Sequence, residues 1–247
     1  MTLDELIEML ARQPRVAVLT GSGISAESGI PTFRGADGLW KQFRAEELAT
    51  PEAFRRDPKL VWEWYRFRRQ IIREAEPNAG HLALAEMEKR LPHFVLITQN
   101  VDGLHQRSGN RKVIELHGNI FIDRCVRCGK EVDRSLEPEP NEEIPHCECG
   151  GLFRPGVVWF GETLPPDALD RAWSAAEQCE VFFSIGTSAV VYPAAGLPEL
   201  AHRRGARVVE INPEATPVSA HADLVMRESA AKALPEIVAH LQSVKPS

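Results

Sequence analysis

The sequence predicts an α/β fold in which a doubly wound parallel sheet carries a smaller second lobe. Short apolar, β-branched runs recur along the chain and indicate strands at 16–20, 94–100, 112–118, 181–188, 207–212 and 222–226. Helix-like segments lie between or around most of them, at 80–90, 166–178 and 194–205. Strands that alternate with amphipathic helices favour a parallel sheet covered on both faces, as in Rossmann-like domains.

Two stretches break this alternation and predict the smaller lobe. Residues 35–75 have helical character, and Thr50-Pro51 and Asp57-Pro58 each place an N-cap residue before a proline at the first helical position. Residues 121–157 hold four of the five cysteines and are predicted to form a zinc-binding module. The remaining residues, 1–34, 76–120 and 158–247, are assigned to the Rossmann-like domain.

Composition excludes several classes of function. The chain has 247 residues, 43% of them hydrophobic, which suits one large domain or a domain with an insert. Its formal net charge of −6 gives no electrostatic support for direct binding to nucleic acid or to a membrane surface. Residues 1–13 form an amphipathic pattern unlike a signal peptide, and no apolar run approaches the length of a membrane span. We expect a cytoplasmic monomer.

The strand at 16–20 runs directly into a glycine-containing loop. Gly21, Gly23 and Ala26 fit the G-x-G-x-x-G/A pattern, in which glycines allow the backbone to approach a pyrophosphate closely. A plain glycine turn between a strand and a helix is the alternative. The region that follows is helical in character and lacks the second strand whose terminal acid usually holds an adenine ribose. If a dinucleotide binds here, other residues must hold that ribose.

Polar residues at the ends of later strands are candidates for this role. Gly186, Thr187 and Ser188 follow one predicted strand, and Asn212 and Glu214 follow the next. Ligands of this architecture bind at the carboxyl ends of parallel strands. Helix N-capping is the alternative role for each of these residues.

The cysteines form two closely spaced pairs. Cys125 and Cys128 are separated by two residues, and Cys147 and Cys149 by one. Each pair can supply one edge of a tetrahedral Zn–S₄ site, with His146 as a competing ligand and redox-active thiols as the alternative. A closed shell of four thiolates leaves no position for water, so this zinc would be structural. The fifth cysteine, Cys179, falls in a helical segment and is expected in the core.

One histidine stands out among eight by its position. His117 ends the apolar run KVIEL and precedes Gly118, which would place its ring at the mouth of the sheet. A histidine there can act as a general base near neutral pH, although a local hydrogen-bonding role is the commoner one. The neighbouring strand ends in Gln99, Asn100 and Asp102, whose amide and carboxylate groups can grip an amide such as nicotinamide.

Together these motifs resemble those of the sirtuins, the NAD-dependent protein lysine deacylases. The matching stretches are GSGISAESGIPTFRG, TQNVDGLHQRSG, ELHGN, the two cysteine pairs, VVWFGE, GTS and INPE, in family order from residue 16 to about residue 235. Ser22 departs from the alanine of many members. The resemblance implies NAD as co-substrate, one structural Zn²⁺ and His117 as the base. It also implies the NAD-binding residues: Gly21, Ser22, Gly23, Ile24, Ser25, Ala26, Phe33 and Arg34 for the pyrophosphate and nicotinamide ribose; Gln99, Asn100, Val101 and Asp102 for nicotinamide; Gly186, Thr187, Ser188, Asn212, Glu214 and Ala230 for adenosine.

The reaction follows from the same resemblance. The acyl oxygen attacks C1′ of the nicotinamide ribose and expels nicotinamide, and His117 deprotonates a ribose hydroxyl so that the acyl group passes to ADP-ribose. The acyl-lysine protein would bind as an added strand between 157–162 and 188–193, with Val158 and Phe160 in contact. The alternatives are a mono-ADP-ribosyltransferase on the same scaffold and a non-catalytic NAD-sensing module. A zinc hydrolase would need an open metal position.

The stretch WEWYRFRRQ, residues 62–70, gathers aromatic and cationic residues in an acidic chain. Helical spacing places Tyr65 and Arg68 on one face, and Tyr-x-x-Arg resembles the sirtuin branch that prefers negatively charged acyl groups. Ala49 resembles the small residue that leaves room for them. A guanidinium and a tyrosine hydroxyl can bind a terminal carboxylate, which predicts removal of succinyl and malonyl as well as acetyl groups. The alternative is a packing stripe made of Trp62, Tyr65 and Arg69.

Overall fold

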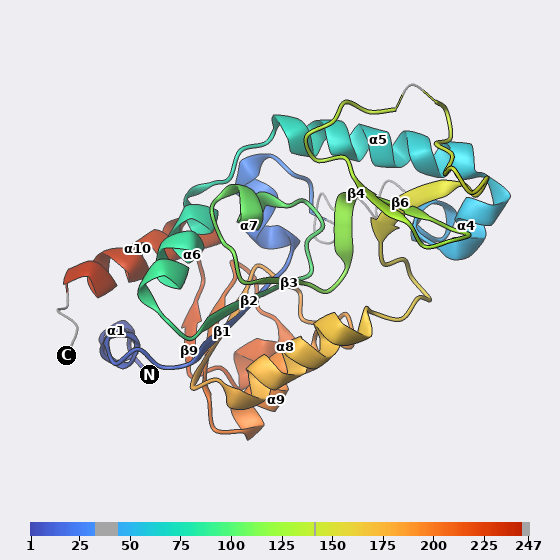
Figure 1. The fold of residues 1–247 in the computed structure, drawn as a ribbon. Coiled ribbons are helices and arrows are strands. Elements are labelled where there is room, and N and C mark those ends of the chain that lie inside the picture. Colours follow the sequence, from blue (N-terminus) through green and yellow to red (C-terminus); the bar gives the residue numbers. More distant parts are fainter. Residues whose placement is uncertain (33–43, 141, 244–247) are drawn as a thin grey trace.

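Six parallel strands form the central sheet of the protein (Figure 1). The computed structural model describes residues 1–32, 44–140 and 142–243, without the side chains of Ala45 and Glu46. The strand order is β3-β2-β1-β7-β8-β9. The strands are β1 (Val16–Thr20), β2 (Phe94–Thr98), β3 (Val113–Glu115), β7 (Val181–Ile185), β8 (Arg207–Ile211) and β9 (Leu224–Met226). Each falls within one of the six predicted strands, and the predicted α/β fold is confirmed.

The order of strand addition changes direction between β1 and β7. The strands β2 and β3 lie on one side of β1, whereas β7, β8 and β9 lie on the other. Val16 of β1 pairs with Phe94 on one side and with Val181 on the other. Every residue of β1 and β7 is buried, so these two strands form the centre of the domain. Such a switch point opens a crevice beyond the carboxyl ends of the strands, where open α/β sheets bind ligands.

Helices cover both faces of the sheet. On one face, α1 (Leu3–Ala11), α6 (Ala79–Arg90) and α10 (Ala230–Ser243) pack in a core cluster with Val16 and Val18. On the other, α8 (Pro166–Gln178) and α9 (Gly196–Arg203) pack with Ala17 and Leu19 (Figure 1). Alternate residues of β1 therefore serve opposite faces, as strand geometry requires. None of the helices in the described ranges is long and apolar enough to span a membrane.

The small lobe combines helices with a second, antiparallel sheet. Its helices are α3 (Ala45–Leu48), α4 (Pro51–Arg56) and α5 (Pro58–Glu74), and its sheet has the order β5 (Glu131–Asp133), β4 (Gly118–Cys125), β6 (Phe153–Val157). Both predicted caps are present: Ala53 N donates to Thr50 Oγ1 at 3.1 Å, and Leu60 N donates to Asp57 Oδ1 at 3.0 Å. The strand β4 runs across residue 120, where the predicted division places a boundary. The lobe has its own buried core, which includes Trp62 and Phe153.

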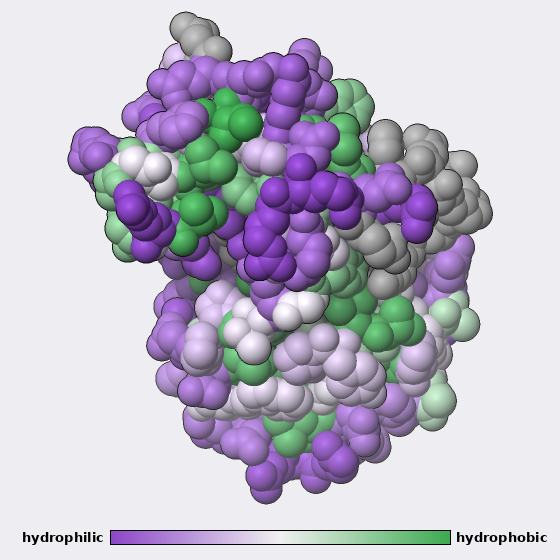
Figure 2. Space-filling view, turned by 90° about the vertical axis from the view of Figure 1, so that its right-hand side faces the viewer, coloured by the Kyte–Doolittle hydropathy of each residue, from purple (hydrophilic) through white to green (hydrophobic). Residues whose placement is uncertain are grey.

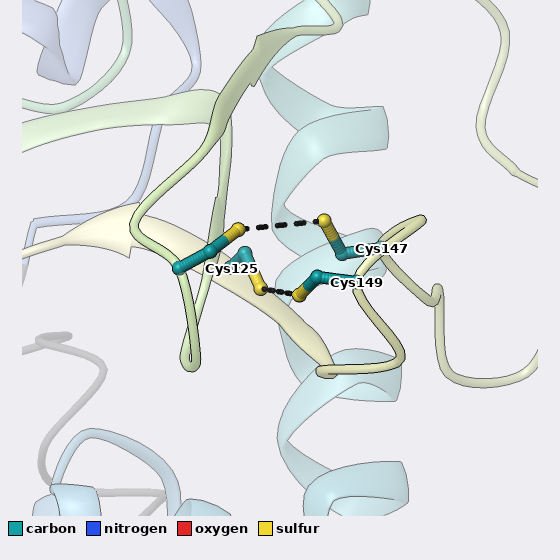
Figure 3. Close-up of side chains that lie close together, drawn as sticks. Cys125, Cys147 and Cys149 are labelled. Carbon is teal, nitrogen blue, oxygen red and sulfur yellow. Dashed lines mark hydrogen bonds between the residues drawn. The ribbon is translucent and has the colours of Figure 1, made fainter.

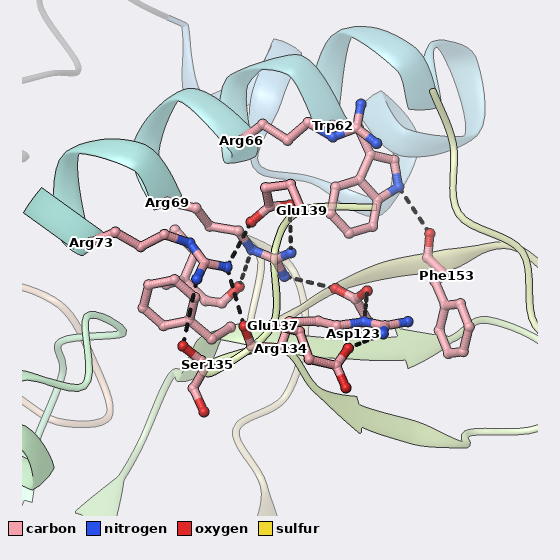
Figure 4. Close-up of polar contacts among 12 residues, drawn as sticks. Trp62, Arg66, Arg69, Arg73, Asp123, Arg134, Ser135, Glu137, Glu139 and Phe153 are labelled. Atoms are coloured by element: carbon pink, nitrogen blue, oxygen red, sulfur yellow. Dashed lines mark hydrogen bonds and ion pairs between the residues drawn. The ribbon is translucent and has the colours of Figure 1, made fainter. Parts of the chain in front are cut away.

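A network of ion pairs joins α5 to this sheet (Figure 4). The Arg69 side chain is fully buried and donates to Asp123 Oδ1 at 2.7 Å, to the Ile120 carbonyl at 2.7 Å and to Glu139 Oε2 at 3.2 Å. Arg73, one turn further along α5, pairs with Glu139 at 3.1 Å. Arg69 and Arg73 thereby fix α5 to the zinc-binding module, and two further residues of the helix, Tyr65 and Arg68, line a cavity.

Candidate active site

A cavity of about 630 Å³ lies beyond the carboxyl ends of β1, β2, β7 and β8 and extends to the small lobe. Figure 2 shows hydrophilic residues over both lobes and an indentation with apolar side chains between them. The predicted residues that line the cavity are Gly21, Ser22, Gly23, Ala26, Ala49, Tyr65, Arg68, Gln99, Asn100, Val101, His117, Val158, Phe160, Gly186, Thr187, Ser188, Asn212 and Glu214. Residues from eight separate parts of the sequence thus meet around this cavity.

The glycine loop owes its position to close contact with the end of β7. Gly23 N, in the first turn of the short helix η1 (Ser22–Ser28), donates to Gly186 O at 2.8 Å. A Cβ added to Gly21 or Gly23 would lie 2.8 or 2.7 Å from the Gly186 oxygen. Gly186 itself has φ +57°, and a Cβ there would meet Ile24 N at 2.5 Å. Any side chain at these glycines would push the loop away from the sheet and change the floor of the cavity.

Other predicted cofactor residues lie beneath the cavity lining. Ser25 Oγ donates to Asp102 Oδ2 at 2.8 Å, and Asn100 Nδ2 donates to Ser25 Oγ at 3.2 Å. Burial raises the pKa of Asp102, and hydrogen bonds from Leu104 N and from Ser25 act in the opposite direction. Ile24 and Ala230 are buried and, like Ser25 and Asp102, are absent from the lining. The two other predicted cofactor residues, Phe33 and Arg34, lie outside the described residues.

His117 lies in the turn between the two sheets, with its ring at the cavity. Its Nδ1 is 2.9 Å from the carbonyl oxygen of Gln99. Because a carbonyl can only accept a hydrogen bond, Nδ1 carries the proton and Nε2 of the neutral ring keeps its lone pair. Burial lowers the pKa of His117, against the raising effect of the Gln99 hydrogen bond. At neutral pH the ring is therefore neutral and can accept a proton at Nε2.

A buried carboxylate, acting through Arg227, stabilises the loop that follows β8. Glu210 is 1% exposed and accepts from Arg227 Nη1 at 2.9 Å. The same Arg227 nitrogen donates to the Glu214 carbonyl at 3.0 Å, and Asn212 Nδ2 donates to that carbonyl at 2.9 Å. These bonds hold a segment of the cavity wall that contains Asn212 and Glu214. Across the cavity floor, Gln99 Nε2 donates to Thr187 Oγ1 at 2.9 Å.

The small-lobe end of the cavity is built around a buried tyrosine and arginine. Tyr65 is 2% exposed and Arg68 is 8% exposed. The Arg68 guanidinium carbon lies 4.8 Å from the Trp64 ring centroid and 5.4 Å from that of Tyr65. Burial lowers the pKa of Arg68, and Tyr65 and Asp102 raise it. A cation held in so dry a place favours an anionic ligand.

The four cysteines of the zinc-binding module come together as predicted. Their sulfurs all lie within 4.8 Å of one another, with Cys125 at 3.5 Å from Cys149 and Cys128 at 3.7 Å from Cys147 (Figure 3). Zn–S bonds of about 2.3 Å in a tetrahedron require sulfurs roughly 3.8 Å apart, so this set fits zinc. Backbone donation from Cys128 is the main reason that the pKa of Cys125 is lowered to about 6. Cys179 is buried, and burial raises its pKa to about 12.

Several residues of the cavity had not been predicted from the sequence as site residues. Trp159 and Glu162 belong to VVWFGE, and Tyr192 belongs to the 188–193 segment, so the motifs contained them without marking their side chains. Glu210 and Arg227 lie outside the lining and support it only through the fold. No short-range pattern links two residues 17 positions apart on separate strand ends.

Comparison with known proteins identifies the family. The Sir2 family profile matches residues 21–193 of the chain. An NAD-dependent protein deacylase of Aquifex aeolicus is 59% identical over 228 residues, which cover 92% of this chain and 95% of that protein. The chain belongs to the Sir2 family. A second Sir2 relative, an NAD-dependent protein deacylase of Thermococcus kodakarensis, is 51% identical, and the aligned residues cover 98% of this chain and 96% of that protein.

Solved structures of the Sir2 family share the whole fold. A Sir2 homologue in complex with NAD superposes with a TM-score of 0.89 at 48% identity, and the match covers 97% of this chain and 94% of the homologue's chain. A Sir2 complex with a p53 peptide and NAD⁺ has a TM-score of 0.85 at 34% identity, and covers 99% and 100% of the two chains. The main sheet and the small lobe are thus arranged as in these Sir2 structures.

Proposed function

We propose that this protein is an NAD-dependent protein lysine deacylase that removes succinyl and malonyl groups as well as acetyl groups. Membership of the Sir2 family supports the deacylase activity. The observation that carries the proposal within the cavity is His117, whose Nδ1 is tied to the Gln99 carbonyl while its ring stays neutral. When bound, NAD would supply an electrophilic ribose carbon that the acyl oxygen can attack, with nicotinamide as the leaving group.

The chain's own residues then have three tasks. The glycine loop and the ends of β7 and β8, through Gly21, Thr187 and Asn212, hold the dinucleotide. His117 accepts a proton at Nε2 during transfer of the acyl group. The closed cysteine site fixes the small lobe and leaves no ligand position for chemistry.

The acyl-lysine peptide would lie along residues 158–160. Val158 N donates to the His117 carbonyl at 2.9 Å and Phe160 N to the Ala49 carbonyl at 3.0 Å, so the segment passes between the base and the small lobe. Phe160 and Tyr192 both line the cavity and are 45% and 73% exposed. Large apolar side chains exposed beside a cavity favour a polypeptide ligand, and an extended peptide can pair with the backbone there.

Acyl preference is assigned to the buried pair at the small-lobe end. Arg68 offers a guanidinium and Tyr65 a hydroxyl to a terminal carboxylate, and Ala49 leaves space beside them. Acetyl-lysine carries no such carboxylate and reacts through the shared chemistry alone.

The test compares succinyl-, malonyl- and acetyl-lysine versions of one peptide with NAD. Arg68→Met should lower kcat/KM for the succinyl peptide about tenfold or more, because a hydrogen bond to a charged group contributes roughly 1.5–3 kcal/mol. The acetyl reaction should change far less. Arg66→Met, two residues earlier on α5 and outside the cavity lining, is the matched control. Equal losses for both acyl groups would make Arg68 structural, and label from NAD that ends on protein would indicate ADP-ribosyl transfer.

A further inference from the structure

Trp159 makes a buried hydrogen bond to the tyrosine of the acyl pocket. Its indole Nε1 donates to Tyr65 Oη at 2.9 Å, and the two side chains are 3% and 2% exposed. The residues are 94 positions apart, and both line the cavity. This bond crosses from the segment after β6 to the helix α5.

The chemistry of the two partners decides the direction of the Tyr65 hydroxyl. An indole N–H is a donor only, so Tyr65 must accept from Trp159. The Arg68 guanidinium beside it is also only a donor, so it cannot accept a hydrogen bond from the Tyr65 hydroxyl. With donors on both sides, the single proton of Tyr65 is left for an acceptor in the cavity that the side chain lines.

The indole ring is held in place by neighbouring protein groups. Trp159 N donates to Glu162 Oε2 at 2.8 Å, and the Arg154 guanidinium carbon lies 3.4 Å from the ring centroid. Arg154 is itself fixed by Glu162, at 2.5 and 2.9 Å, and by the Val157 carbonyl at 2.8 Å. On α4, Phe54 packs 5.5 Å from the ring. The N–H of Trp159 is thus preset toward Tyr65.

We propose that Trp159 is a positioning residue for acyl selectivity: it commits the Tyr65 hydroxyl to donate to the terminal carboxylate of a succinyl or malonyl group. The inference rests on the proposed function and deepens it. A carboxylate can only accept hydrogen bonds, so it binds more tightly where the Tyr65 hydroxyl is already oriented to donate. An acetyl methyl group can take no such bond, and the preset orientation gives it no advantage.

The experiment measures the ratio of succinyl to acetyl kcat/KM. Trp159→Phe removes the indole N–H and keeps an aromatic ring against Arg154, and the ratio should fall about fivefold, mainly through KM of the succinyl peptide. Trp62→Phe is the matched control, since Trp62 also makes a buried indole bond in the small lobe, to the Phe153 carbonyl at 3.0 Å, but lies outside the cavity lining.

A double-mutant cycle with Tyr65→Phe makes the test specific. Once the hydroxyl is gone, Trp159→Phe should change the ratio no further, because the indole acts only through Tyr65. A ratio unmoved by Trp159→Phe, moved equally by Trp62→Phe, or changed additively in the Tyr65→Phe background would overturn the inference. Failure of the wild-type enzyme to accept the succinyl peptide is a distinct result, which would overturn the proposed acyl preference itself.

Discussion

Replacing Arg69 by methionine should destabilise the protein more than the same change at Arg66, which is only half-buried on the same helix. The Arg69 side chain is 0% exposed and makes three hydrogen bonds, to Asp123, to the Ile120 carbonyl and to Glu139. Asp123 is equally buried, and its other oxygen keeps only Arg134, at 3.2 Å. Arg69→Met would leave a buried carboxylate oxygen and a buried carbonyl without their partner.

The magnitude follows from that geometry. Removing one partner of a buried ion pair costs about 3–5 kcal/mol, because the remaining charge stays uncompensated. Arg66 lies one turn earlier on α5, and its guanidinium donates only to the carbonyls of Glu142 and Glu143 at the surface. Arg66→Met should therefore cost no more than about 1 kcal/mol.

The assay is denaturant unfolding at constant zinc, followed by far-UV circular dichroism, with metal content measured on each variant. Adding Asp123→Asn to Arg69→Met should restore part of the lost stability, since it removes the uncompensated charge. If Arg69→Met cost no more than Arg66→Met, or if Asp123→Asn lowered the stability of the double variant further, the ion pair would not be the stabilising element that this reasoning requires.

His117→Ala should lower kcat at least about 100-fold while NAD binding, measured by calorimetry, is retained. In the wild-type enzyme, a plot of kcat/KM against pH should rise on its acidic side at a pH below the usual histidine pKa, because burial lowers the pKa of His117. A rise at or above about pH 6.5 would contradict the assignment. Cys147→Ser should lose the one zinc per chain and destabilise the small lobe, and full activity at near-zero metal content would refute the zinc site. Burial lowers the pKa of His81 to about 4, so only the unfolded chain takes up this proton as pH falls below about 6.5. Because burial also lowers the pKa of His105, the free energy of unfolding should drop by at least about 2 kcal/mol between about pH 7.5 and pH 5, and equal values at the two pH values would contradict this.

The central sheet could be predicted because its signals are local. Each strand is a short apolar run, and the glycine pattern sits at a fixed distance behind one of them. Strand ends were less well predicted: the sequence predicts a strand over 112–118, but β3 stops at Glu115. Gly118 has φ +74°, and a Cβ there would lie 2.2 Å from the Gly156 oxygen. The chain thus turns from one sheet to the other around His117, a conformation that hydrophobicity does not encode.

Contacts between distant segments could not be predicted. Asp123 and Glu139 are 54 and 70 positions from Arg69, and their local sequence does not indicate that they pair with α5. The alternative of a packing stripe for residues 62–70 contains part of the answer, since Trp62, Tyr65 and Arg69 are all buried. Burial and a role at the cavity are compatible here because the buried stripe of α5 contacts the zinc-binding module through Arg69 and lines the cavity through Tyr65.

Backbone and side chains of residues 158–160 carry separate tasks. The peptide N–H groups of Val158 and Phe160 hold the carbonyls of His117 and Ala49, and such bonds do not depend on which side chains the segment bears. The side chain between them, Trp159, reaches Tyr65 instead. A substitution at position 159 therefore alters the donor to Tyr65, while the backbone bonds to His117 and Ala49 persist. Under the proposed function, acyl preference could therefore change through a single side chain while the contacts that hold His117 remain.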